Sequence, residues 1–178
     1  MIINALLLFF LLLVLLLGAT FIMHLIIRVP YVPTSRPMTR AMVELAGLHD
    51  GQTVIDLGAG DGRLLQEAVT KHPGVRAIGV ELVPTVWMWG WLRTRGTGRV
   101  KFLLGNALTA DLTGVDVVFL YMMPQIMEKL EARFDWELRP GAVVISHAFR
   151  FPNRQPEREE KVNGKTVLRY VWTPATHG

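Results

Sequence analysis

The sequence of 178 residues contains no cysteine. This absence excludes a disulfide framework, a thiolate metal site and a cysteine nucleophile, and it fits a reducing compartment. The five histidines are scattered, without the H-x-x-x-H spacing that places two imidazoles on one face of a helix. We therefore predict that the protein binds no metal.

Charged residues are missing from the first part of the chain, because no side chain from Ile2 to Ile27 is charged. As a helix, this run would be about 39 Å long, which is enough to cross a hydrocarbon core of about 30 Å with some tilt. A cleaved signal peptide would need a basic start, a shorter apolar stretch and an A-x-A-like site, and the segment has none of these. Residues 1–27 are therefore predicted to be a retained transmembrane anchor.

Basic residues follow the apolar segment but do not precede it. Arg28, Arg36 and Arg40 lie after it, so the positive-inside rule predicts a single-pass membrane protein whose C-terminal domain faces the cytoplasm. The formal net charge of +4 falls on the part after residue 27, and attraction to anionic lipid head groups explains it most simply. Because no basic run is interleaved with aromatic residues, we predict no nucleic-acid partner.

The remainder divides into a linker and one domain. Residues 28–37 contain three prolines and are predicted to be an extended linker. Residues 38–178 have a usual size for one domain. At the junction, Thr34 or Ser35 is a candidate cap for a helix that continues to about Leu48.

Within this domain, apolar strands alternate with helices. The runs rich in Val, Ile and Leu predict a mostly parallel sheet with helices on both faces. The "NG" pair at 163 and 164, between two alternating runs, predicts a closing antiparallel hairpin. The expected fold class is therefore α/β. The expected strands are residues 53–58, 75–82, 99–106, 115–121 and 141–149, and the expected helices are residues 62–72, 84–95 and 124–138.

A glycine-rich turn, "GAGDG", follows the first predicted strand. Its glycines, Gly58, Gly60 and Gly62, are predicted to bring backbone N–H groups close to a ligand at the carboxyl edge of the sheet. The dinucleotide fingerprint G-x-G-x-x-G would need glycine at position 63, where this chain has Arg63. NAD is therefore disfavoured as the ligand.

Glu81 ends the second predicted strand, 19 positions after the last glycine of the turn. A carboxylate at this place can accept hydrogen bonds from both hydroxyls of a ribose. The alternative is a tight structural turn with a solvated glutamate, and a glycine loop alone would leave that alternative open. The loop and the acid together favour a ligand that contains a ribose.

The segments "VIDLGAGDG", "GVEL" and "GNALTADL" together resemble the seven-strand, class I S-adenosylmethionine-dependent methyltransferases. The resemblance implies a Rossmann-like fold and S-adenosyl-L-methionine as the cofactor. It also implies that the glycine loop contacts the methionine part, Glu81 the ribose and Asn106 the adenine. The cofactor-binding residues that it implies are Asp56, Gly58, Ala59, Gly60, Gly62, Glu81, Leu82, Asn106 and Ala107.

A narrower resemblance covers nearly the whole chain. A short apolar anchor, "PYVPTSRPMTRAM", "VVFLYMMPQIMEKLEARF" and "FRFPNRQP" are similar to the small membrane-anchored lysine methyltransferases that modify the ATP synthase c subunit and the adenine nucleotide translocase in mitochondria. The resemblance implies a protein-lysine N-methyltransferase whose substrate is a membrane protein. Because a transit segment rich in Arg and Ser is absent, we interpret the chain as a prokaryotic relative in an inner membrane.

Three side chains are candidates for the chemistry. Tyr31 and Thr34 belong to the "YVPT" element that distinguishes the resembling family, and an ordinary helix cap is the alternative role for Thr34. Tyr121 ends the fourth predicted strand in "LYMMP", which lacks the [N/D]-P-P-[Y/F] pattern of class I enzymes that methylate planar nitrogen. Methylation of adenine or glutamine is therefore disfavoured. An apolar wall for a lysine stem is expected instead, with core packing as the alternative.

Two further features have both a packing and a functional interpretation. His147 ends the fifth predicted strand, where a packed histidine is expected rather than a general base. Trp87 and Trp91 lie four residues apart on one helical face and are expected to pack on the sheet. The alternative is a second membrane contact, with arginines near lipid phosphates. Those arginines are Arg93, Arg95 and Arg99.

Three functions remain in competition. The leading one is an anchored protein-lysine N-methyltransferase that acts on a membrane protein near the bilayer surface. The second is a methyltransferase of a lipid or quinone head group, which would explain the anchor equally well. The third is a tethered S-adenosylmethionine-binding protein without catalysis, because no general base is obvious in the sequence.

Overall fold

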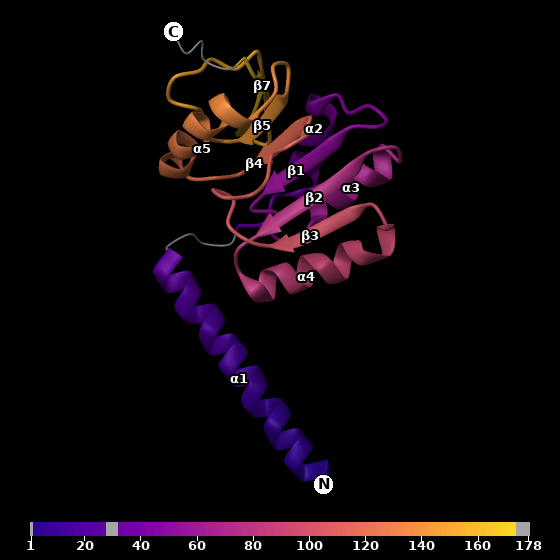
Figure 1. Ribbon diagram of the computed structural model, residues 1–178, viewed down its shortest axis with the longest axis vertical. Helices are drawn as coiled ribbons and strands as arrows, with labels where there is room; N and C mark the ends of the chain where they lie inside the picture. Colours follow the sequence, from indigo (N-terminus) through magenta and orange to yellow (C-terminus); the bar gives the residue numbers. More distant parts are fainter. Residues whose placement is uncertain (1, 28–31, 174–178) are drawn as a thin grey trace.

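The structure, a computed structural model, describes residues 2–27 and 32–173, without the side chains of residues 23–27. It contains one seven-stranded sheet covered by helices, and helix α1 (Ile2–Ile27) extends away from it (Figure 1). The strands are β1 (Thr53–Leu57), β2 (Arg76–Glu81), β3 (Val100–Leu104), β4 (Val117–Leu120), β5 (Val143–His147), β6 (Arg158–Val162) and β7 (Lys165–Val171). The other helices are α2 (Arg36–Ala46), α3 (Arg63–Lys71), α4 (Pro84–Thr94) and α5 (Pro124–Glu137), and a short 3-10 helix covers Arg95–Thr97.

The strand order across the sheet is β3-β2-β1-β4-β5-β7-β6. Strands β1 to β5 pair in parallel, whereas β7 lies antiparallel to both β5 and β6. The β6–β7 turn consists of Asn163 and Gly164, whose φ angles of 50° and 77° are the left-handed values that a two-residue hairpin turn requires. The predicted α/β fold, with a mostly parallel sheet and a C-terminal antiparallel hairpin, is confirmed.

Apolar side chains fill both faces of the sheet, because successive residues of a strand point to opposite sides. On the central strand β4, Val117 and Phe119 pack with α2 and α3 in one cluster. Val118 and Leu120 pack with α5 in the other cluster. All four side chains are fully buried, and each contributes roughly 1.5–3 kcal/mol of transfer free energy to folding. This double burial fixes the carboxyl ends of the central strands, where the cavity described below opens.

The first helix of the domain differs in detail from the expectation. It ends at Ala46 rather than near Leu48, because Gly47 adopts a left-handed φ of 62° and donates its N–H to the Glu44 carbonyl. Ser35 occupies the N-cap position but makes no side-chain capping hydrogen bond.

Helix α1 contains one apolar span, Ile2–Ile22, that is long enough to cross a membrane, although a signal sequence meets the same criteria. Its side chains are exposed apart from the half-buried Thr20. A helix that is apolar on every side needs an apolar environment, and the rest of the chain does not supply one here. At the domain end, the Thr20 hydroxyl donates to the Thr85 hydroxyl of α4 at 3.1 Å.

Candidate active site

A cavity of about 370 Å³ opens at the carboxyl ends of β1, β2 and β4. This volume lies within the range of roughly 300–1,000 Å³ that is usual for small-molecule sites. Its walls come from residues 32–34, the glycine loop, the segment 105–108 and the start of α5. The position at the carboxyl edge of a parallel sheet is the usual ligand site of open α/β folds.

The glycine loop forms the floor of this cavity. Gly58, Gly60 and Gly62 have φ angles of 81°, 57° and 73°, which are left-handed values that favour glycine. A Cβ atom on Gly58 would lie 2.7 Å from the Met122 Cε atom, so it would fill space beside the cavity wall. Gly62 does not line the cavity, and a Cβ atom there would lie 2.8 Å from Thr94 of α4.

Glu81 is the carboxylate that the structure places beside the loop. It is buried at the end of β2 and lines the cavity. Its Oε2 accepts the N–H of Gly60 at 3.0 Å, and its Oε1 accepts the N–H of Val83 at 2.9 Å. An ionised carboxylate has about four acceptor positions. After these two bonds, Glu81 therefore keeps acceptor capacity on both oxygens for a ligand with neighbouring hydroxyls.

A second carboxyl group, Asp56, lies deeper, near the end of β1. Burial raises its pKa to about 8, and the neighbouring Glu81 and Asp61 carboxylates act in the same direction. Asp56 is therefore mostly protonated at neutral pH in the ligand-free protein. A cation that entered the cavity would favour the ionised form.

An ion-pair cluster ties the segment before α2 to the glycine loop. The Arg63 guanidinium donates to Asp61 through Nε at 2.9 Å and to the Thr34 carbonyl through Nη1 at 2.9 Å. Arg93 of α4 also pairs with Asp61, at 3.2 Å. Burial would raise the pKa of Asp61, but the hydrogen bonds and charge of Arg63, with Arg93, outweigh it and lower that pKa. Thr34 is thereby held at the cavity through its main chain.

The segment after β3 closes another side of the cavity. Gly105 donates its N–H to the Glu81 carbonyl at 2.9 Å, which joins this segment to β2. The exposed Asn106 accepts the Leu108 N–H through Oδ1 at 2.9 Å, so its amide group is oriented by its own loop. Ala107 lies half-buried beside it.

Tyr121 lines the cavity at the end of β4 and stacks on two rings. Its ring centroid lies 4.0 Å from that of His147 and 6.2 Å from that of Phe149. His147 is buried, and burial, with a smaller contribution from Lys165, lowers its pKa to about 4. No hydrogen-bond partner for either ring nitrogen is found within residues 2–27 and 32–173. His147 is therefore a neutral packed ring behind Tyr121, as expected.

Most of the residues expected at the site converge on this cavity. Tyr31 lies outside the described residues, and Gly62 lies behind the loop. The expected residues that line the cavity are Thr34, Asp56, Gly58, Ala59, Gly60, Glu81, Leu82, Asn106, Ala107 and Tyr121. Sequence reasoning did not assign a role to Asp61, Arg63, Ile126 or Phe149, which also line it.

The mouth of the cavity is apolar. Leu82, Met122, Met123, Ile126 and Phe149 all contribute to it. Among the described lining residues the one cation is Arg63, whose guanidinium is already hydrogen-bonded to Asp61. The mouth therefore suits an aliphatic stem better than a polyanionic backbone.

Residues 56–158 match the ANTKMT methyltransferase domain family. A protein-lysine N-methyltransferase from Saccharolobus islandicus is 32% identical over 150 residues, which cover 80% of this chain and 93% of that protein. The lysine N-methyltransferase of the ATP synthase c subunit from Rattus norvegicus is 30% identical over 79% of this chain, which spans 65% of the rat protein.

Solved structures show the same fold. An RNA methyltransferase from Salinibacter ruber, in complex with S-adenosyl-L-homocysteine, superposes with a TM-score of 0.75 and 34% identity. The superposition covers 79% of this chain and 93% of that protein. A methyltransferase from Thiobacillus denitrificans, also in complex with S-adenosyl-L-homocysteine, superposes over 66% of this chain and 50% of that protein, with a TM-score of 0.57 and 22% identity.

Proposed function

The chain belongs to the ANTKMT methyltransferase domain family and is an S-adenosylmethionine-dependent methyltransferase, and from this premise we propose that it is a membrane-anchored protein-lysine N-methyltransferase. The observation that carries the proposal is its likeness to protein-lysine N-methyltransferases over 80% of its length. The apolar span Ile2–Ile22 supports anchoring. The proposed substrate is a membrane protein whose lysine lies near the cytoplasmic surface of a prokaryotic inner membrane.

The residues of the cavity fit the cofactor. Gly58, Ala59 and Gly60 present backbone without side chains that would fill the space, and we assign the methionine part to them. Glu81, with acceptor capacity on both carboxylate oxygens, would hold the ribose hydroxyls. Asn106 and the Ala107 N–H would meet the adenine. When bound, S-adenosylmethionine supplies a methyl group on a positively charged sulfonium.

Asp56 gives a test of cofactor binding that is independent of turnover. Its pKa of about 8 in the ligand-free protein should fall when a cationic ligand binds, so binding at pH 7 should release a substantial part of one proton. Affinity should accordingly rise with pH up to about 8 and then level off. Titration calorimetry in two buffers with different ionisation enthalpies measures this proton. The Asp56→Asn variant should release none, and equal release from both proteins would contradict the assignment.

The acceptor lysine must be neutral before it can attack. Apolar surroundings lower the pKa of an ammonium group, and the mouth formed by Met122, Met123 and Phe149 offers such surroundings. The hydroxyls of Thr34 and Tyr121 line the same cavity and would orient the free amine by hydrogen bonding. The buried, neutral His147 lies behind Tyr121 and does not line the cavity. Positioning and desolvation, rather than a strong base, would therefore promote the reaction.

The Thr34→Ala variant should lose turnover more than cofactor affinity. Arg63 binds the Thr34 main-chain carbonyl, so the substitution removes the hydroxyl while the tie to the glycine loop remains. We expect kcat to fall about tenfold, the usual scale for one lost orienting hydrogen bond. Thr34→Ser should keep most of the rate. An unchanged rate in Thr34→Ala would exclude the proposed role of the hydroxyl.

The proposed function is tested by following the methyl group. The full chain is incubated with methyl-tritiated S-adenosylmethionine and membranes from a strain that lacks the gene, with excess S-adenosylhomocysteine as the inhibited control. Label in protein, released on hydrolysis as methyl-lysine, is the expected result. Label confined to the organic extract would instead establish a lipid or quinone acceptor, which the apolar mouth also fits. Label confined to RNA would point to the acceptor class of the Salinibacter protein.

A further inference from the structure

Helix α4 carries an exposed apolar surface on the side away from the sheet. Gly90 and Thr94 are its buried residues and face inward. Residues three or four positions apart share one side of a helix, and the outward side holds large apolar side chains with exposed fractions of about two fifths or more. These residues, which we name the α4 face, are Met88 (43%), Trp89 (59%), Trp91 (41%) and Leu92 (40%).

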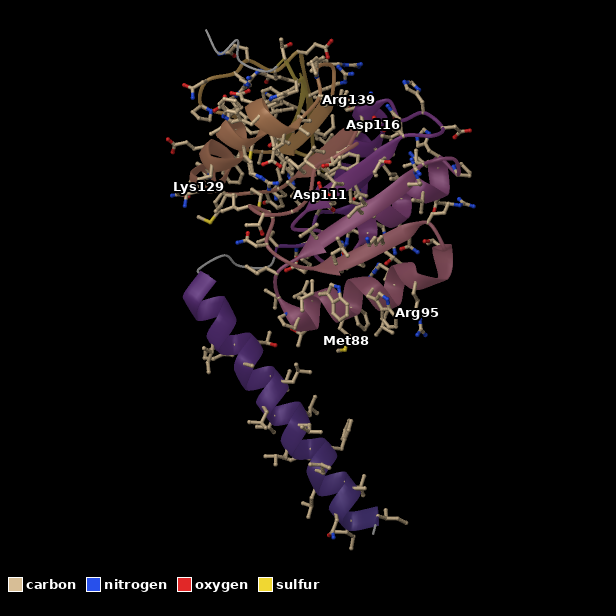
Figure 2. The ribbon with its side chains drawn as sticks, in the orientation of Figure 1. Met88, Arg95, Asp111, Asp116, Lys129 and Arg139 are labelled. Carbon is tan, nitrogen blue, oxygen red and sulfur yellow. The ribbon has the colours of Figure 1, made fainter. Side chains whose placement is uncertain are left out.

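The α4 face lies beside the end of the apolar span. Thr20 of α1 is hydrogen-bonded to Thr85 in the first turn of α4, and the span continues only to Ile22. At 1.5 Å per residue, its end lies about 3 Å beyond Thr20 along the helix. The first turn of α4 therefore lies at the level where the span leaves the hydrocarbon. Figure 2 shows Met88 extending from α4 on the side of the domain from which α1 projects.

The composition of the α4 face matches that level of a bilayer. Tryptophan rings are enriched where hydrocarbon meets head groups. Trp91 stacks on Trp87 with centroids 6.4 Å apart, and Trp87 donates its indole N–H to the Phe102 carbonyl at 3.2 Å, so the exposed ring rests on an anchored one. The guanidinium of Arg95, exposed at the end of α4, lies 5.4 Å from the Trp91 ring. An arginine in this place can reach lipid phosphates.

We propose that the α4 face docks on the head-group layer of an anionic bilayer, so that the domain is held by α1 and by α4 together. This inference rests on the proposed anchoring of α1. Docking would fix the height and orientation of the cavity above the membrane, and the enzyme would select lysines presented at that height. The opposite side of α4 contacts the cofactor loop, because a Cβ on Gly90 would lie 2.8 Å from the Gly60 carbonyl. The docked helix therefore also supports the cofactor site.

A single introduced cysteine tests this surface, because the chain has none of its own. Met88→Cys places a polarity-sensitive fluorophore on the α4 face, and Lys129→Cys on α5 is the exposed control away from it (Figure 2). The full chain is inserted into vesicles of phosphatidylcholine and phosphatidylglycerol, and iodide quenching is measured. We expect the label at position 88 to be quenched several-fold less than the label at position 129. A second substitution, Trp89→Glu or Leu92→Glu, should restore quenching at position 88, whereas Trp136→Glu on α5 should not.

Two results would overturn the docking proposal. Equal quenching at both positions, in protein that floats with the vesicles and resists carbonate extraction, would show an anchored domain with a free α4 face. Protection at position 88 that grows with protein density at constant lipid would show contact with a second copy instead. Carbonate extraction and methyl transfer report anchoring and activity separately, so their failure is distinguishable from a failure of docking.

Discussion

Replacement of Glu81 by alanine should lower the affinity for S-adenosylmethionine by about a hundredfold or more. A hydrogen bond to a charged group contributes roughly 1.5–3 kcal/mol, and Glu81 is assigned one to each ribose hydroxyl. The loss of both corresponds to about two to four powers of ten in the dissociation constant. Titration calorimetry of the purified full chain measures the change directly.

The same carboxylate also supports the loop, so stability must be measured beside affinity. Removal of Glu81 leaves the N–H groups of Gly60 and Val83 without their acceptor, at a cost of about 1–3 kcal/mol for each group that stays buried. Glu81→Gln can still accept one of these bonds but carries no charge, and it should fall between alanine and the parent in both measurements. Glu128→Ala, at an exposed position on α5, is the matched control. Unchanged cofactor affinity in Glu81→Ala would contradict the ribose assignment.

Much of the fold could be predicted because its signals are local. Each central strand is a run of apolar residues flanked by turn residues, and "NG" at 163 and 164 specifies a two-residue hairpin turn without help from the rest of the chain. The end of α2 was less predictable. Both Gly47 and Leu48 fit a helical end by pattern, and the left-handed conformation of Gly47 decides it.

The cavity could be predicted where strand ends meet. The carboxyl ends of adjacent parallel strands share one edge, so Asp56 on β1 and Glu81 on β2 had to lie near each other once the strands were placed. The contact from Arg63 to the Thr34 carbonyl could not be predicted, because it joins segments 29 positions apart through a main-chain atom. The signal that was available is Arg63 itself, a long basic side chain directly after the glycine turn.

Exposure was the other property that the pattern left open. Trp87 and Trp91 lie on one helical face in the sequence, and both were expected to pack on the sheet. In the structure Trp87 is half-buried and bonded to Phe102, whereas Trp91 is exposed outside it. A helix that lies across the edge strand β3 buries a narrower stripe than one that lies over the centre of a sheet. The sequence periodicity gives the direction of a side chain but not the width of the surface that covers it.

The Gly90→Ala variant is the second substitution with a large expected effect, and its sign is the reverse of the usual one. Alanine in place of glycine inside a helix ordinarily stabilises by about 1 kcal/mol. At this position the added Cβ would lie 2.4 Å from Phe102 Cζ and 2.8 Å from the Gly60 carbonyl oxygen. Helix α4 must therefore move outward or the glycine loop must move. We expect a loss of about 1–3 kcal/mol in the free energy of unfolding, the range for an overpacked core.

Cofactor affinity should fall in the same variant, because Gly60 donates to Glu81 and its displacement moves both. A loss of about tenfold corresponds to one weakened hydrogen bond to a charged group. Gly96→Ala is the matched control, since a Cβ there meets nothing within 4 Å. In the double variant with Phe102→Leu, the ring atoms that the new methyl group would strike are gone while the Gly60 carbonyl remains. Part of the stability should then return without the affinity. Full recovery of affinity in the double variant would assign the effect to Phe102 and separate α4 from the cofactor loop.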